Sequence, residues 1–313
     1  MQNPVSSISN FKEFLKKILL PYFLLTLAIG FVFNLFFEKN IILGSYSSGA
    51  YKINRLISSN NKNEIAFFGS SRAERSFLPD SLVKDGFNYG MVGTSSDVLL
   101  FCLKEECKKK NKSVPIVFAF DFNGLNYGLG DISNYLYNSD YQPIRILIGS
   151  NYKYIYHVPF LKYYGHFEIY TKYYLNNTIS LTKLNDKGGA IEKNELTKAN
   201  FDELVKLRLG ENNTFQNDPK LLSDFLNIIN ANKNRKFILV APPYHKSFFA
   251  RFTNLNKAEE FLGSLKSYKN VVVLDFSRLP YPDNYFFDTS HLNLTGAIKF
   301  NHLLRDSLAH YIN

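Results

Sequence analysis

Cysteine is nearly absent from this chain of 313 residues. The two cysteines, Cys102 and Cys107, are too few for the disulfide framework that stabilises many small secreted proteins. If both lie on one helix, their spacing turns the two thiols toward different faces of that helix. The sequence therefore predicts free, buried thiols rather than a disulfide bridge or a metal site.

Acidic side chains are scarce relative to basic ones. The chain has 27 Asp and Glu residues against 37 Lys and Arg residues, which gives a net charge of +10. Such an excess suits nucleic acid, an anionic membrane surface or an acidic polymer. However, the basic residues are scattered, and the one tight run, Lys108–Lys110, follows an apolar helical pattern, where lysines favour a helix C-terminus. The charge pattern therefore argues against nucleic acid as a partner.

Charge is absent from residues 18–37, a run of 20 mostly apolar residues. This is the length that a helix needs to cross the ~30 Å hydrocarbon core of a bilayer. Three lysines lie between residues 12 and 17, so we expect residues 1–17 in the cytoplasm and the chain after the anchor outside it. A cleaved signal peptide is the alternative, but its apolar region would be shorter, and Asn34–Lys39 offers no small-residue cleavage site.

The rest of the chain has the pattern of one α/β domain. Residues 38–63 include a stretch rich in Ser, Asn and Lys and are predicted to be a linker. Residues 64–313 have the size of a single domain. Short apolar runs alternate with helical patterns five times, which predicts a parallel sheet of about five strands flanked by helices on both faces.

A long region without a strong strand signal, residues 126–235, interrupts this alternation and is predicted to be a helical insertion. Its segment Tyr135–Tyr174 is crowded with aromatic residues. Aromatic rings with polar tips suit sugar rings, a membrane interface or a partner protein. The alternative is that these residues pack the interior of a small helical cap.

The stretch E-I-A-F-F-G-S-S-R at residues 64–72 is the first candidate site. Ile65–Phe68 has the pattern of a buried strand, and the turn Gly69–Ser71 ends it. In open α/β sheets, ligands bind beyond the carboxyl ends of the strands, so the Ser71 hydroxyl is a candidate for chemistry. Alternatively, this serine-rich turn only caps the next helix.

A second candidate lies near the end of the chain. Among the six histidines, only His291 has an acidic residue three positions before it, namely Asp288. This spacing lets a tight turn bring the carboxylate to one ring nitrogen while the other nitrogen is free to act as a general base.

The motifs G-S-S-R and D-x-x-H resemble the first and last sequence blocks of the SGNH (GDSL-type) hydrolase superfamily. The resemblance implies a three-layer α/β fold of the SGNH-hydrolase or flavodoxin-like kind. It also implies that Ser71 is the nucleophile, His291 the base and Asp288 its orienting partner. No metal or organic cofactor is implied.

Two stretches between these motifs resemble the middle blocks of the superfamily. N-Y-G-M-V-G-T at residues 88–94 implies that Gly93 donates its N–H to an oxyanion hole, next to the N–H of Ser71. At residues 122–124 the chain has F-N-G where the family has G-N-D, and the matching position implies a donor role for Asn123. Because of this departure, Asp121 or a neighbouring loop residue is an alternative. Both stretches also have the composition of ordinary turns.

Three further residues are candidates for substrate binding. Arg72 follows the proposed nucleophile, and Tyr244 and His245 follow the apolar strand pattern at 236–241. If the strands are parallel, Tyr244 and His245 lie at the same sheet edge as Ser71. A turn with a solvated histidine is the alternative for His245.

Ser70 replaces the aspartate that usually precedes the nucleophile in the superfamily. This variant resembles a membrane-anchored branch associated with cell-envelope acyl transfer, as in teichoic acid D-alanylation and alginate O-acetylation. The resemblance implies an extracytoplasmic esterase or O-acyltransferase acting on O-acyl groups, expected to be acetyl, of a cell-envelope polysaccharide. The implied partners are that polysaccharide or its acyl donor, the membrane and a membrane-bound O-acyltransferase. The alternative is a non-catalytic scaffold that assists such an O-acyltransferase.

Overall fold

The computed structural model describes the N-terminal helix and most of the α/β domain. The described residues are 11–42, 49–109, 112–127, 214–250 and 252–312, with a few isolated residues between 167 and 203. Most of the predicted insertion, residues 126–235, lies outside this part of the chain, as does almost all of Tyr135–Tyr174.

Five parallel strands form one sheet in the order β2-β1-β3-β4-β5. This is the flavodoxin-like order of doubly wound sheets, and the strand order reverses between β1 and β3. The prediction of a five-stranded parallel sheet is confirmed. The strands are β1 (Ile65–Phe68), β2 (Gly86–Asn88), β3 (Ile116–Ala119), β4 (Phe237–Ala241) and β5 (Val271–Asp275).

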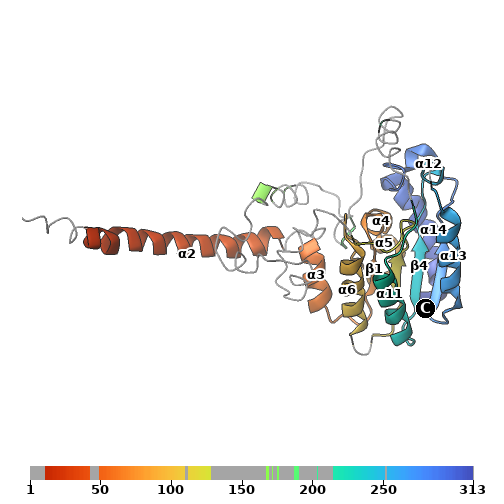
Figure 1. The fold of residues 1–313 in the computed structure, drawn as a ribbon, viewed down its shortest axis with the longest axis horizontal. Helices are drawn as coiled ribbons and strands as arrows, with labels where there is room; N and C mark the ends of the chain where they lie inside the picture. Colours follow the sequence, from red (N-terminus) through yellow and green to blue (C-terminus); the bar gives the residue numbers. More distant parts are fainter. Residues whose placement is uncertain are drawn as a thin grey trace, which may run out of the picture.

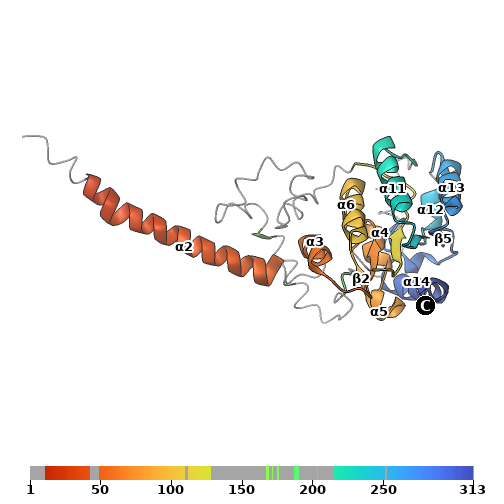
Figure 2. The same cartoon turned by 90° about the horizontal axis from the view of Figure 1, so that it is seen from below.

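Helices cover both faces of the sheet, as Figures 1 and 2 show. Ala66 and Phe68 of β1 point into one apolar cluster, and Ile65 and Phe67 point into the other, because successive strand residues face opposite ways. The first cluster packs under α3 (Gly49–Ser58), α6 (Ser96–Cys107), α11 (Pro219–Ala231), α12 (Lys246–Phe249) and α13 (Leu255–Ser264). The second packs under α4 (Ser71–Ser76), α5 (Pro79–Leu82) and α14 (Leu294–Ile312), and short 3₁₀ turns occupy Leu265–Ser267 and Asp283–Tyr285.

The start of α11 shows how local sequence sets a helix boundary. The Asp218 side chain accepts hydrogen bonds from the N–H groups of Lys220 (2.9 Å) and Leu221 (3.0 Å). Pro219 takes the first helical position, where its missing N–H costs nothing. An aspartate directly before a proline is a sequence pattern that predicts such a helix start.

Both cysteines are free thiols on α6, as the sequence predicts. Cys102 is buried and Cys107 is half-buried. Burial raises the pKa of each thiol to about 12, so both are neutral at physiological pH.

The prediction that all of residues 38–63 form a linker is wrong, because α3 (Gly49–Ser58) lies within this range and packs against the domain. Ala50, Ile53 and Leu56 of this helix are fully buried against the domain. Lys52 on the same helix is also fully buried. The sequence gives a weak signal here because α3 is short and carries polar residues that pair with partners far along the chain. The described domain therefore begins at residue 49.

The N-terminal segment forms one helix of 30 residues, Phe11–Asn40, and an 18-residue stretch of it has a mean hydropathy of 2.1. Its core is α2 (Leu20–Phe37), flanked by π-helical turns at Leu15–Leu19 and Glu38–Ile42. Large apolar side chains along it are exposed, and the helix projects away from the α/β domain (Figure 1). The helix is long and apolar enough to span a membrane.

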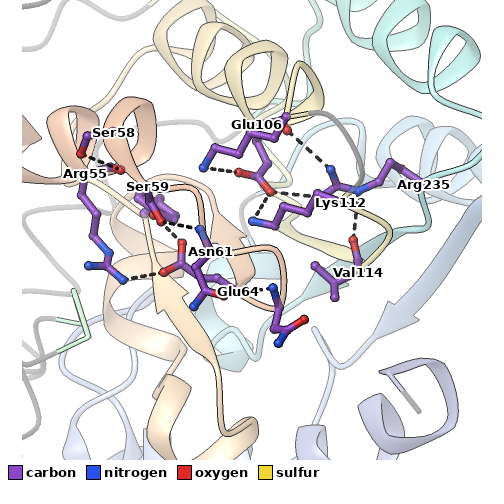
Figure 3. Close-up of polar contacts among 12 residues, drawn as sticks. Arg55, Ser58, Ser59, Asn61, Glu64, Glu106, Lys112, Val114 and Arg235 are labelled. Atoms are coloured by element: carbon purple, nitrogen blue, oxygen red, sulfur yellow. Dashed lines mark hydrogen bonds and ion pairs between the residues drawn. The ribbon is translucent and has the colours of Figure 1, made fainter.

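A buried ion cluster joins the end of α6 to the start of β4 (Figure 3). The carboxylate of Glu106, which is fully buried, lies 2.6 Å from Lys112 Nζ, 2.9 Å from Lys109 Nζ and 3.1 Å from an Arg235 guanidinium nitrogen. Arg235 also donates to the carbonyl of Val114 at 3.0 Å. Burial disfavours the carboxylate, but Lys112 and Lys109 outweigh it and hold the pKa of Glu106 below its usual range.

Replacing Glu106 with glutamine should lower the free energy of unfolding at pH 7 by about 3–5 kcal/mol, because it leaves buried cations without a counter-ion. The folded-state pKa of Glu106 is depressed, so its contribution is present above the ordinary carboxyl value of 4.5 and is lost as pH falls through the folded-state value. Urea unfolding should therefore show a gap between wild type and Glu106→Gln that shrinks below about pH 4.5. The exposed Glu260→Gln serves as the control, and equal stability of the two variants would contradict this account.

Candidate functional site

Ser71 is the first residue of α4, directly beyond the carboxyl end of β1. The turn before it depends on Gly69, whose φ is 147°. A Cβ on Gly69 would lie 2.7 Å from the Ala73 Cβ and 2.8 Å from the Ala119 Cβ, so no larger residue fits. Ser70 caps α4 with its side chain. The two serines therefore have different roles: the Ser70 side chain caps the helix, whereas the Ser71 side chain does not.

The Ser71 hydroxyl contacts a histidine from the other end of the chain. Ser71 Oγ lies 2.8 Å from His291 Nε2. The other ring nitrogen, His291 Nδ1, lies 2.8 Å from Asp288 Oδ2 and 3.0 Å from Asp288 Oδ1. Asp288 is 1% exposed and His291 is 7% exposed. A hydroxyl, an imidazole and a buried carboxylate in this order have the geometry of a catalytic triad.

The turn at residues 288–291 holds the carboxylate in place. Asp288 Oδ1 accepts hydrogen bonds from the N–H groups of Ser290 (2.8 Å) and His291 (2.9 Å), and from the Ser290 hydroxyl (3.0 Å). Because the carboxylate can only accept, His291 Nδ1 carries the proton between them. His291 Nε2 is then the acceptor for the Ser71 hydroxyl, which is the arrangement of a general base.

The loop with Gly93 is fastened beside α4. The N–H of Met91 donates to the carbonyl of Gly69 at 3.1 Å, and the N–H of Val92 donates to Glu74 Oε2 at 3.1 Å. Gly93 follows with a φ of 64°, a conformation that favours glycine, and it is exposed. The loop that contains the predicted oxyanion donor is therefore tied to the turn and helix that contain the serine.

Three buried polar residues that the sequence did not single out support this loop. Lys52 Nζ donates to Glu74 Oε1 at 2.7 Å and also to the carbonyl of Gly90. Asn88 donates to the carbonyls of Ala73 (2.8 Å) and Phe77 (2.9 Å) and accepts from the N–H of Gly90 at 2.8 Å. Asn88 is the first residue of the motif N-Y-G-M-V-G-T, so the sequence could have indicated its supporting role. Lys52 and Glu74 belong to no motif that would indicate theirs.

Asn123 lies in the turn after β3. Its N–H donates to Asp121 Oδ1 at 3.1 Å, and its exposed side chain lines a cavity of about 200 Å³ together with Ser70, Thr94 and Asp121. Asp121 accepts further hydrogen bonds from Tyr244 Oη (3.0 Å) and from Ser70 Oγ (3.4 Å). The side chain of Asn123 is therefore available at this sheet edge, while the Asp121 carboxylate is engaged by protein groups.

Arg72 joins the turn that contains His291 to the loop that follows β4. Its guanidinium donates to the carbonyls of Ser290 (3.0 Å), Pro242 (2.7 Å) and Pro243 (3.1 Å) and stacks 3.1 Å above the centre of the Tyr244 ring. Arg72 is 3% exposed and Tyr244 is 2% exposed. Burial raises the pKa of Tyr244, so its hydroxyl stays protonated as the donor to Asp121. The substrate-binding role of both residues stays a prediction.

His245 is not a solvated turn histidine, and that alternative is wrong. The residue is 3% exposed and caps α12. Its Nδ1 lies 2.6 Å from Ser247 Oγ, and its Nε2 lies 3.0 Å from Asp283 Oδ1. The hydrogen bond from His245 holds the pKa of Asp283 below its usual range. The backbone N–H of His245 also donates to the carbonyl of Thr289 at 3.0 Å, which joins this loop to the turn that contains Asp288 and His291.

Arg72→Lys should reduce kcat by up to about 10²-fold, because a lysine cannot make the same fork of hydrogen bonds or stack on Tyr244. The loss of these contacts would let the serine turn shift relative to the histidine turn. Steady-state kinetics on an aryl ester would measure kcat and KM separately, with the exposed Arg305→Lys as the control. Unchanged kcat with a raised KM would instead favour the substrate-binding role.

The structure thus brings Ser71, Asp288 and His291 into direct contact, and it holds the loop of Gly93 and the turn of Asn123 at the same edge of the sheet. Arg72, Tyr244 and His245 lie behind this group in the packed interior. No protein-family model and no curated protein matches this sequence.

Proposed function

We propose that this protein is a membrane-anchored serine esterase or O-acyltransferase of the SGNH type, acting on O-acyl groups of a cell-envelope glycan. The single observation that supports this most is the 2.8 Å contact between Ser71 Oγ and His291 Nε2, with Asp288 2.8 Å from the other ring nitrogen. The two motifs that resemble the superfamily, G-S-S-R and D-x-x-H, supply these three residues.

In the first half of the reaction, His291 Nε2 takes the proton from the Ser71 hydroxyl as Ser71 Oγ attacks the acyl carbonyl carbon. Asp288 stabilises the imidazolium that forms. The tetrahedral intermediate then collapses, the bond to the leaving alcohol breaks, and that alcohol takes the proton from His291 Nε2. The product is an acyl ester on Ser71.

The negative charge on the tetrahedral oxygen needs hydrogen-bond donors. The proposed donors are the N–H groups of Ser71 and Gly93 and the side-chain amide of Asn123. Each donor of this kind contributes ~3–4 kcal/mol in comparable sites. The hydrogen bonds that tie the Gly93 loop to Gly69 and Glu74 support its part in this set, because they hold the loop beside α4.

In the second half, water or a sugar hydroxyl gives its proton to His291 Nε2 and attacks the acyl carbon. The bond between this carbon and Ser71 Oγ then breaks, and Ser71 Oγ takes the proton from His291 Nε2, which restores the free serine. Water yields hydrolysis and a sugar hydroxyl yields acyl transfer. Both routes use the same triad and differ in how the pocket excludes water.

The N-terminal helix would anchor this domain on the outer side of the membrane. The lysines before residue 18 favour a cytoplasmic N-terminus, and residues from about 40 onward would then lie outside the cytoplasm. This location suits a glycan substrate, its acyl donor or a membrane-bound O-acyltransferase partner.

A non-catalytic scaffold that assists such an O-acyltransferase is the second candidate. The observation that favours it is the Asp121 carboxylate, which lines the same cavity as Asn123. A negative charge at this place opposes the formation of an oxyanion, whereas a scaffold has no such requirement.

Labelling with a fluorophosphonate probe tests the proposal. The full-length protein in lipid nanodiscs should form a covalent adduct on the peptide that contains Ser71, because the probe needs an activated serine. Peptide mass spectrometry identifies the modified residue. A natively folded protein that neither labels nor hydrolyses aryl acetate would favour the scaffold.

A further inference from the structure

The cavity that Ser70 lines is mainly apolar and also has several polar residues in its lining. The apolar lining residues come from β3 and the segment after it and from helices α6, α11 and α13; they are Leu99, Phe118, Phe120, Leu125, Phe225 and Phe261. The polar residues that line it are Ser70, Thr94, Ser95, Ser96, Asp121, Asn123 and Asn126. Ser70 is next to Ser71 in the chain, and Thr94 is next to Gly93. Part of the cavity therefore lies next to the proposed oxyanion hole, and the rest is lined by residues of β3, α6, α11 and α13.

The chemistry of the lining excludes several classes of ligand. No Lys, Arg or His is among the described residues that line the cavity, and Asp121 repels anions, so a phosphate or a carboxylate does not fit. A sugar ring needs several hydrogen-bond partners around it. Most of the cavity wall is hydrocarbon, and the side chains of Ser95, Ser96 and Asn126, which also line it, already form hydrogen bonds with other protein groups. A neutral aliphatic chain with one polar end matches the lining best.

Thr94 adds a polar group at the right place. Its hydroxyl oxygen is buried, and within the described part of the chain it has no hydrogen-bond partner. A buried hydroxyl without a partner is costly, so a ligand oxygen at this end of the cavity would relieve it. The carbonyl oxygen of an acyl group is such an atom.

The volume sets the length of the chain. An apolar cavity of about 150 Å³ accommodates benzene, which has six carbons. The cavity beside Ser70 has about 200 Å³, which is space for a linear chain of roughly six to eight carbons. An acetyl group has two carbons and would leave most of this space empty.

We infer that this cavity binds the acyl chain of the substrate, and that the preferred acyl group is a linear chain of roughly six to eight carbons rather than acetyl. The inference rests on the proposed function, since it names the acyl group that reacts at Ser71. The chain would lie along Phe118 and Phe225, with its carbonyl at the end where Thr94 and Asn123 lie.

A series of aryl esters from acetate to dodecanoate tests the inference with the full-length protein in lipid nanodiscs, where no free detergent chain competes. Each buried methylene should raise kcat/KM about fourfold, up to roughly six to eight carbons, and longer chains should gain nothing more. Maximal kcat/KM on the acetate, with a steady fall for longer esters, would overturn the inference.

Two substitutions in the walls should move the optimum in opposite directions. Leu99→Phe reduces the space and should shift the preferred chain to fewer carbons, whereas Phe225→Leu enlarges it and should shift the preference to more. Opposite shifts cannot arise from a general loss of stability. Ile298→Phe on the exposed face of α14 is the matched control and should keep the wild-type profile. An unchanged profile in both wall variants would overturn the inference.

Binding without catalysis separates this inference from the proposed function. Titration calorimetry on Ser71→Ala should detect octanamide, a neutral amide of an eight-carbon acid, and should detect no binding of acetamide. Octanamide binding in a protein that hydrolyses no ester would contradict the proposed function and leave the chain site standing. Ester hydrolysis without octanamide binding would do the reverse.

Discussion

Replacing Ser71 with alanine is expected to lower kcat for aryl ester hydrolysis by at least about 10⁴-fold. The substitution removes the oxygen that lies 2.8 Å from His291 Nε2, and with it the atom that would form the acyl-enzyme. Ser71 is half-buried and does not cap its helix, since Ser70 does that, so the thermal unfolding temperature should change little. Stopped-flow assays of wild type and long-incubation assays of Ser71→Ala together cover the expected range of rates. Fluorophosphonate labelling should be absent in Ser71→Ala.

The matched control is Ser307→Ala on α14. The Ser307 hydroxyl donates to the carbonyl of Leu303 within its own helix at 3.4 Å. This variant should keep the wild-type rate and the wild-type labelling. Wild-type rates in Ser71→Ala would show that another group performs the hydrolysis, and the triad would have to be abandoned.

Asp288→Asn is expected to lower kcat by about 10⁴-fold while the turn remains folded. The asparagine oxygen can still accept the N–H groups of Ser290 and His291, which now bond Asp288 Oδ1 at 2.8 and 2.9 Å. Its NH₂ group, however, would face His291 Nδ1, where the carboxylate now accepts a proton. The ring would then carry its proton on Nε2, toward Ser71, and could not act as a base.

Nitrogen-15 NMR of histidine tests this cause directly. Wild type should show His291 protonated on Nδ1, and Asp288→Asn should show it protonated on Nε2. The exposed Asp306→Asn should change neither the tautomer nor the rate. A loss of activity without a change of tautomer would mean that the carboxylate acts in another way, for example by charge alone.

Local patterns predicted much of the fold. Apolar runs of strand length predicted β1 and β4, and the pair Asp218–Pro219 has the composition of a helix start, which α11 confirms. The spacing of Asp288 and His291 predicted a turn that joins carboxylate and imidazole. These features depend on side chains within a few positions of one another, so the sequence alone contains the information.

The residues that the sequence missed or misjudged depend on contacts between distant segments. Lys52 is buried because Glu74, 22 positions away, accepts its hydrogen bond. The guanidinium of Arg72 is engaged by carbonyls more than 160 positions along the chain. His245 is buried by a loop that includes Asp283. No local period or turn motif signals such partners, and each of these residues looks exposed in the sequence.

The sequence by itself determined the alternation of strands and helices, the apolar helix near the N-terminus and the three residues of the candidate triad. Only the tertiary structure decided that Ser71 and His291, 220 positions apart, lie within hydrogen-bond distance. It also decided that residues of β3, α6, α11 and α13 line one cavity together with Ser70. The physical reason is that short-range patterns set the type of each element, whereas the order of the parallel strands sets which of their ends are neighbours.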